Sequence, residues 1–196
     1  MNDPKAGDKK TSTPAHSGFS VRMLEAEDIA ALTPVLREHV RDLHSGQVVE
    51  SEVNAIQSYM QGAADEFGRT RRYLVAFNAE GTAIGCMALA VPEERMAQHF
   101  AGITGAPGTT SVELLNAFVA TAYLRGQGIG RMLLEAICRM GAADGAHTLL
   151  INSGPRYRHS WAFYDRVCDS SHGFIDDYYG EGRHAKTWLK DLRTFA

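Results

Sequence analysis

The sequence predicts one α/β domain whose first half is antiparallel. Two apolar stretches, residues 72–77 and 83–91, flank a turn that ends in Gly81, and this pattern is typical of a β-hairpin. A third apolar strand at residues 111–121 leads through a glycine-rich turn into an amphipathic helix at residues 129–143. These patterns together indicate a sheet with helices packed against it.

The other elements follow from the spacing of apolar residues. Residues 1–18 are polar and show no such spacing, so we expect a disordered tail ahead of a domain at residues 19–196. Pro34 marks a kink or a break in the first helix. The remaining segments of the domain are a strand at 19–24, helices at 29–43 and 52–67, a long loop with a short helical piece at 93–110, a strand at 147–152, a helix at 160–167 and a strand pair at 174–179 and 185–189.

Composition narrows the class of protein. The chain has 196 residues, enough for one self-sufficient core, and a formal net charge of −3 with no dense run of Lys or Arg, which disfavours a nucleic-acid partner. The three cysteines, Cys86, Cys138 and Cys168, are far apart and form no metal-binding pattern. No segment has the roughly 20 apolar residues that span a bilayer. We therefore expect a cytoplasmic protein without a membrane partner and without a metal.

The turn between the third strand and the long helix suits a phosphate group. The first N–H groups of a helix lack partners within the helix and carry partial positive charge, so they bind anions well. Glycines at 126, 128 and 130 let the backbone approach phosphate oxygens without a Cβ in the way. The charged side chains of Arg125 and Arg131 stand at either end of this turn.

Two common phosphate motifs do not fit the count. The dinucleotide fingerprint needs a third glycine at position 131, where Arg131 stands, and the Gly-Lys-Ser/Thr of a P-loop is missing. The spacing Arg125-x-x-Gly128-x-Gly130 instead resembles the coenzyme A signature of the GNAT superfamily of N-acetyltransferases. Trp161 to Arg166, followed by Gly173 and Phe174, is similar to a second family motif, although eight residues separate Tyr164 from Gly173. We interpret the extra residues as a loop insertion.

The resemblance implies a GNAT fold, with a twisted mixed sheet and helices on both faces, and acetyl-coenzyme A as cosubstrate. It also implies that the Val119 amide binds the thioester oxygen and that an amine attacks the thioester directly. The coenzyme contacts that it implies are Phe118, Val119, Ala120, Arg125, Gly126, Gln127, Gly128, Ile129, Gly130, Arg131 and Asn152. For Asn152, a structural role in the loop is the alternative.

Two residues are candidates for proton transfer. Glu113, six residues before Val119, matches a position where some family members carry a catalytic Glu, so it is the candidate base. Tyr164 is the candidate acid, because a phenol can protonate a departing thiolate. The alternatives are a hydrogen-bonded strand residue for Glu113 and a core aromatic for Tyr164.

The acceptor is left open between a small-molecule amine and a protein N-terminus or lysine, and a homodimer is left open as the assembly. Asp176 to Tyr179 suit a cationic amine, and an ordinary hairpin is the alternative for them. The histidines, among them His39 and His159, are interpreted as surface or capping residues. The rival function is a non-catalytic coenzyme A sensor or regulatory module on the same fold.

Overall fold

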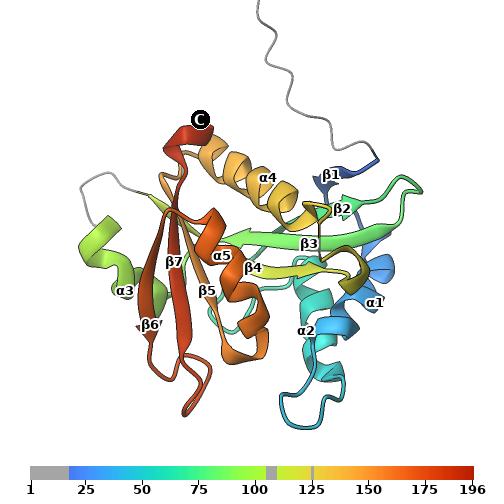
Figure 1. Cartoon of the computed structure of the whole chain (residues 1–196), viewed down its shortest axis with the longest axis horizontal. Helices are drawn as coiled ribbons and strands as arrows, with labels where there is room; N and C mark the ends of the chain where they lie inside the picture. The colour runs from blue at the N-terminus through green and yellow to red at the C-terminus, as the bar shows by residue number, and fades with distance from the viewer. Residues whose placement is uncertain (1–17, 105–109, 125) are drawn as a thin grey trace, which may run out of the picture.

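The computed structural model describes residues 18–104, 110–124 and 126–196, and these residues form one seven-stranded sheet with helices on both faces (Figure 1). The sheet order is β1-β2-β3-β4-β5-β7-β6. In chain order the elements are β1 (Ser20–Met23), α1 (Asp28–His39), α2 (Glu50–Met60), β2 (Arg72–Phe77), β3 (Ala83–Ala90), α3 (Glu94–Thr104), β4 (Ser111–Val119), η1 (Thr121–Tyr123), α4 (Ile129–Ala143), β5 (Thr148–Ser153), η2 (Pro155–Ser160), α5 (Trp161–Val167), β6 (Ser170–Ile175), β7 (Ala185–Asp191) and η3 (Arg193–Phe195).

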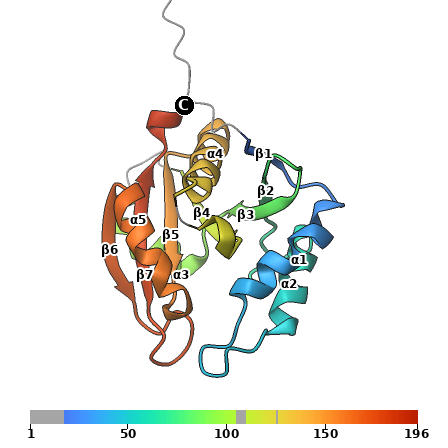
Figure 2. The ribbon, with the colours of Figure 1, turned by 45° about the vertical axis from the view of Figure 1, so that its right-hand side comes forward.

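The sheet is split between β4 and β5. Strands β1 to β4 form an antiparallel meander, as the sequence predicts, whereas β4 and β5 run parallel and pair only from Ser111 to Glu113. Beyond Glu113 the β4 backbone carries an irregularity at Asn116, which has a positive φ of 46°. Because the two strands stop pairing there, they diverge towards the end of β4 (Figures 1 and 2). This divergence leaves space inside the fold for a ligand.

Side chains alternate between two cores across the first half of the sheet. On β2, Tyr73 and Val75 face α1 and α2, while Leu74 and Ala76 face α4, which is the period-two pattern of a buried strand. In the second half, Trp188 of β7 packs with α5. On the opposite face Leu150 of β5 packs with α3. Helices on both faces therefore cover the two halves of the sheet around the split.

Several predicted elements have different bounds. Helix α4 has the predicted bounds, and α1 runs through Pro34 without a break. Helix α2 ends at Met60, seven residues before the predicted end at residue 67, because Gly62 adopts a positive φ of 96°. Residues 93–110 contain the three-turn helix α3 in place of a short helical piece. The predicted tail at residues 1–18 lies, except for Gly18, outside the described residues.

The C-terminal hairpin also differs from the prediction. Strand β6 begins at Ser170, whereas the sequence predicted a strand at 174–179. Gly173, with a φ of 72°, lies within a register shift between Ser171 and Phe174, so β6 takes up residues that had been interpreted as a loop insertion. Residues 176–179 form a turn. Within the described ranges, no helix is long and apolar enough to cross a bilayer.

Candidate functional site

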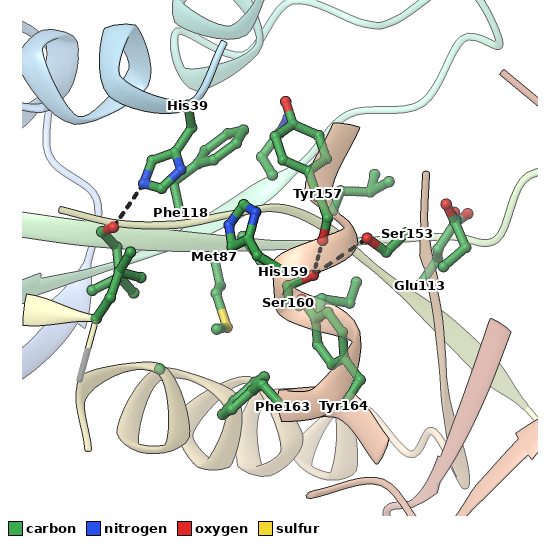
Figure 3. A pocket seen from close by; sticks show the side chains of 18 of the residues that line it. His39, Met87, Glu113, Phe118, Ser153, Tyr157, His159, Ser160, Phe163 and Tyr164 are labelled. Atoms are coloured by element: carbon green, nitrogen blue, oxygen red, sulfur yellow. Dashed lines mark hydrogen bonds between the residues drawn. The ribbon is translucent and has the colours of Figure 1, made fainter. Parts of the chain in front are cut away.

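A cavity of about 1050 Å³ occupies the split between β4 and β5 (Figure 3). Its wall includes the start of α4, the second half of β4, the end of α1, and residues of η2 and α5. The cavity brings together most of the site residues that the sequence predicts, namely Glu113, Phe118, Val119, Gly126, Gly128, Ile129, Gly130, Arg131, Asn152 and Tyr164. Arg125 lies outside the described residues, and neither Ala120 nor Gln127 lines the cavity.

The start of α4 has the geometry of an anion cradle. Gly128 caps the helix in the left-handed conformation (φ 73°, ψ 8°), and Gly126 also has a positive φ of 81°. Only glycine adopts such angles without strain. Residues 126–128 are exposed, and Met132 makes the first bond into the helix, to the Gly128 carbonyl. The amides just ahead of Met132 therefore have no partner within the helix, and their residues line the cavity at the positive end of a helix dipole.

The backbone of β4 presents Val119 to the split. The Ala120 amide donates to the Ile84 carbonyl on β3 at 2.8 Å, and the Ala120 carbonyl accepts from the Tyr123 amide. Since neighbouring residues of a strand point their amides to opposite sides, the Val119 amide points away from β3, and Phe118 points towards β3 as Ala120 does. The Val119 amide is thus available to a ligand in the split, whereas the Ala120 amide is engaged with β3. The coenzyme contacts of Phe118, Val119 and Ala120 stay predictions.

Tyr164 projects from α5 into the cavity and is 6% exposed. Its ring packs 5.1 Å from the Trp188 ring, and Asp165 next to it accepts a hydrogen bond from the Trp188 indole at 2.8 Å. The hydroxyl makes no hydrogen bond to any residue that the structure describes and is not sealed from solvent. Burial raises the pKa of Tyr164, which keeps the phenol protonated and able to act as a donor.

Glu113 lies at the other end of the cavity in a buried ionic network. Its Oε2 accepts from the Arg69 guanidinium at 2.8 Å and from the Glu93 amide at 2.9 Å, and its Oε1 accepts from Asn152 at 2.9 Å. Burial raises the pKa of Glu113, while the Glu93 amide and Arg69 act in the opposite direction. The residue is 0% exposed, so a direct contact with an amine requires a rearrangement. Its role as a base stays a prediction.

Asn152 links β5 to the turn after β6. Its Nδ2 donates to Glu113, and its Oδ1 accepts from the Tyr179 hydroxyl. Both ends of the amide are therefore engaged within the protein. This arrangement fits the structural alternative for Asn152, and its contact with the coenzyme stays a prediction.

The network around Arg69 makes stability depend on pH. Burial alone would raise the pKa of Asp65, but hydrogen bonds from Arg69 and Arg71 lower it to about 2. A carboxyl with a depressed pKa stabilises the fold above its unfolded pKa of about 3.9, and this stabilisation is lost as the pH falls from about 4 to 2. We expect Asp65→Asn to lower the free energy of unfolding at pH 7 by about 2 kcal/mol. Urea unfolding at pH 7 and pH 3 measures this, and equal losses at both values would contradict the linkage.

Several residues that line the cavity have no role in the site predicted from the sequence. His39 at the end of α1 donates from Nε2 to the Val119 carbonyl at 2.7 Å, and the His159 ring stacks near it with centroids 6.3 Å apart. Tyr178 and Tyr179 do line the cavity, while Asp176 and Asp177 lie beside His184 outside it. The contact of His39 with a residue 80 positions away leaves no local pattern in the sequence.

Comparison with known proteins agrees with this geometry. The family model described as the acetyltransferase (GNAT) family matches residues 36–169. No curated protein sequence matches the chain. Among solved structures, the chain is similar to an N-acetyltransferase from Staphylococcus aureus, with 14% identity, a TM-score of 0.61, and 90% of this chain and 100% of that chain covered.

Two further structures show the same fold at low identity. A mutant of the spermidine N-acetyltransferase SpeG from Vibrio cholerae is 14% identical, with a TM-score of 0.60 and 91% and 96% of the two chains covered. The yncA protein of Salmonella typhimurium, whose structure contains acetyl-CoA, is 16% identical, with a TM-score of 0.58 and coverage of 90% and 95%. These likenesses show the GNAT fold that the sequence predicted. Because the family model covers most of the chain, this protein belongs to the GNAT family of acetyltransferases.

Proposed function

We propose that this protein transfers an acetyl group from acetyl-coenzyme A to a primary amine by direct attack. The observation that carries the proposal is one continuous cavity that joins the glycine cradle of α4, the open side of β4 and the free hydroxyl of Tyr164. The phosphates would lie against the amides at the start of α4, and the thioester would lie along β4 near Val119. An activated acetyl group is what the bound coenzyme would supply.

Different groups of the protein would assist different steps of the reaction. The Val119 amide points into the split, where a donor stabilises the charge that develops on a thioester oxygen. The Tyr164 hydroxyl faces the same cavity as a protonated donor for the departing thiolate. The walls hold the amine and the thioester side by side, which by itself supplies much of the rate enhancement in a two-substrate reaction.

The acceptor is proposed to be a cationic amine. Glu93 and Glu113 give the far end of the cavity two buried carboxylates, and Arg69 pairs with Glu113. Among the described residues, no cation lies within ion-pair distance of the Glu93 carboxylate, so this carboxylate is available to an ammonium group. The aromatic rings of Tyr178 and Tyr179 form part of the same wall and suit an ammonium group. One structural relative is itself a spermidine acetyltransferase.

Two measurements test the proposal. Calorimetry with acetyl-coenzyme A should show binding. Thiol release should then depend on an added amine in a panel of spermidine, phenethylamine, Nα-acetyl-lysine and a dipeptide with a free N-terminus. We expect turnover to be highest for amines that carry a second positive charge. Binding without thiol release across the whole panel would favour the rival, a coenzyme A sensor on the same fold.

A further inference from the structure

We propose that His39 is the base that removes the proton from the acceptor amine, an inference that rests on the acetyl transfer proposed above. Glu113, which the sequence favours for this step, has no exposed surface and three donors on its carboxylate. His39 instead combines a fixed orientation with a free nitrogen at the other end of the same cavity. Figure 3 shows its ring directed from the end of α1 towards β4, beside the ring of Phe118.

One hydrogen bond determines which ring nitrogen is available. The Val119 carbonyl can only accept, so the Nε2 of His39, at 2.7 Å, must carry a proton. In the neutral ring Nδ1 then holds the lone pair. Nδ1 has no partner among the described residues, and it is not one of the buried polar atoms that lack a partner, so it is open to solvent. A neutral imidazole held in this tautomer can accept one proton.

The same hydrogen bond places the imidazole near the proposed reaction centre. The amide of Val119 points into the split, and the carbonyl of the same residue accepts the hydrogen bond from His39. The neighbouring Glu38 accepts from the Thr121 amide at 2.6 Å, so the end of α1 is fastened to the chain on both sides of Ala120. The base and the thioester site are therefore fixed to the same short stretch of backbone, which favours a constant distance between them.

A second histidine lies beside His39 at this wall of the cavity. His39 is the last residue of α1, and the ring centroids of His39 and His159 are 6.3 Å apart. Burial lowers the pKa of His159, and the nearby His39 lowers it further. The His159 ring therefore stays neutral and can pass a proton towards solvent. The other titratable or charged groups at this wall are Tyr157, the Glu52–Arg156 ion pair, and Glu38, Arg41 and Asp42 at the end of α1.

Acetyl transfer removes two protons from the acceptor nitrogen. The ammonium first gives one proton to Nδ1 of His39, which passes it to solvent past His159. The neutral amine then forms a bond to the thioester carbon, and the second proton of its nitrogen passes to the freed Nδ1. The carbon–sulfur bond breaks, and the thiolate takes the proton of the Tyr164 hydroxyl. His39 again releases its proton to solvent, and Tyr164 regains one from solvent. An ammonium ion and a thioester thus become an amide, a thiol and one free proton.

The decisive experiment compares His39→Gln with the wild type in thiol release between pH 5 and pH 9. A glutamine amide can still donate to the Val119 carbonyl, but it does not titrate. We expect kcat to fall about 100-fold and the dependence of kcat/KM on pH between 5 and 8 to disappear. The affinity for acetyl-coenzyme A should stay within about twofold. In His39→Ala, added imidazole should restore part of the rate.

Controls separate the possible outcomes. His44→Gln, on the exposed loop beyond α1, should behave as the wild type does. An unchanged kcat and pH profile in His39→Gln would overturn the assignment, as would loss of the pH dependence in Glu113→Gln instead. The slow hydrolysis of acetyl-coenzyme A by water provides a readout that needs no acceptor. A wild type that binds the coenzyme but releases no thiol to any amine or to water would refute the proposed function, and the role of His39 with it.

Discussion

Gly128→Val is expected to weaken the binding of acetyl-coenzyme A by about 100-fold. Gly128 holds a left-handed conformation at the cap of α4, and a β-branched residue disfavours that conformation strongly. To relieve the strain, the turn would have to change the direction of the amides that follow it. Those amides are the groups that the proposal assigns to the phosphates. Calorimetry with coenzyme A measures the effect without any need for turnover.

The other end of the same helix offers a matched control. Gly145 follows α4 with a φ of 79°, and no heavy atom lies within 4 Å of an added Cβ, so Gly145→Val adds a similar backbone strain far from the cradle. It should lower the melting temperature as Gly128→Val does, yet leave the affinity for coenzyme A unchanged.

A second control is Gly130→Ala, whose affinity for coenzyme A should stay within about threefold of the wild-type value, because the added Cβ would meet Phe163 at an ordinary 3.5 Å. Equal affinities for Gly128→Val and Gly145→Val would refute the cradle.

Tyr164→Phe should reduce kcat by about 100-fold while the affinity for acetyl-coenzyme A stays nearly constant. The substitution removes only the hydroxyl and leaves the ring packed against Trp188. A general acid typically contributes 100-fold or more to the rate. Because burial raises the pKa of Tyr164, the wild type should also retain this donor through neutral and moderately alkaline pH. Steady-state kinetics with a saturating amine measures kcat, and equilibrium binding measures the affinity.

Tyr59→Phe is the control for the loss of a phenol outside the cavity, since Tyr59 lies on α2 beside Arg71. It should retain the turnover of the wild type. If Tyr164→Phe also retained full turnover, Tyr164 would be a packing residue of α5, and the thiolate would leave without help from this side chain.

The family and the cradle could be predicted from the sequence because both depend on local patterns. The bounds of α4 follow from apolar residues at helical spacing, and the phosphate turn follows from the count of glycines between Arg125 and Arg131. The hairpin of β2 and β3 follows from two apolar stretches around one turn. Each of these signals lies within about 20 consecutive residues. The family model and the structural relatives confirm the fold that these signals predicted.

Only the tertiary structure decided which side chains meet in the cavity. The sequence left Glu113 open between a base and a hydrogen-bonded strand residue, and it does not show that Arg69 and the amide of Glu93 reach this carboxylate. The sequence favoured a surface or capping role for His39, whereas the fold places its ring on the Val119 carbonyl. The physical reason is that helix and strand periodicity assign a residue to a face within its own element. Contacts between elements depend instead on how the sheet splits and on which helices cover it, and no stretch of neighbouring residues encodes that arrangement.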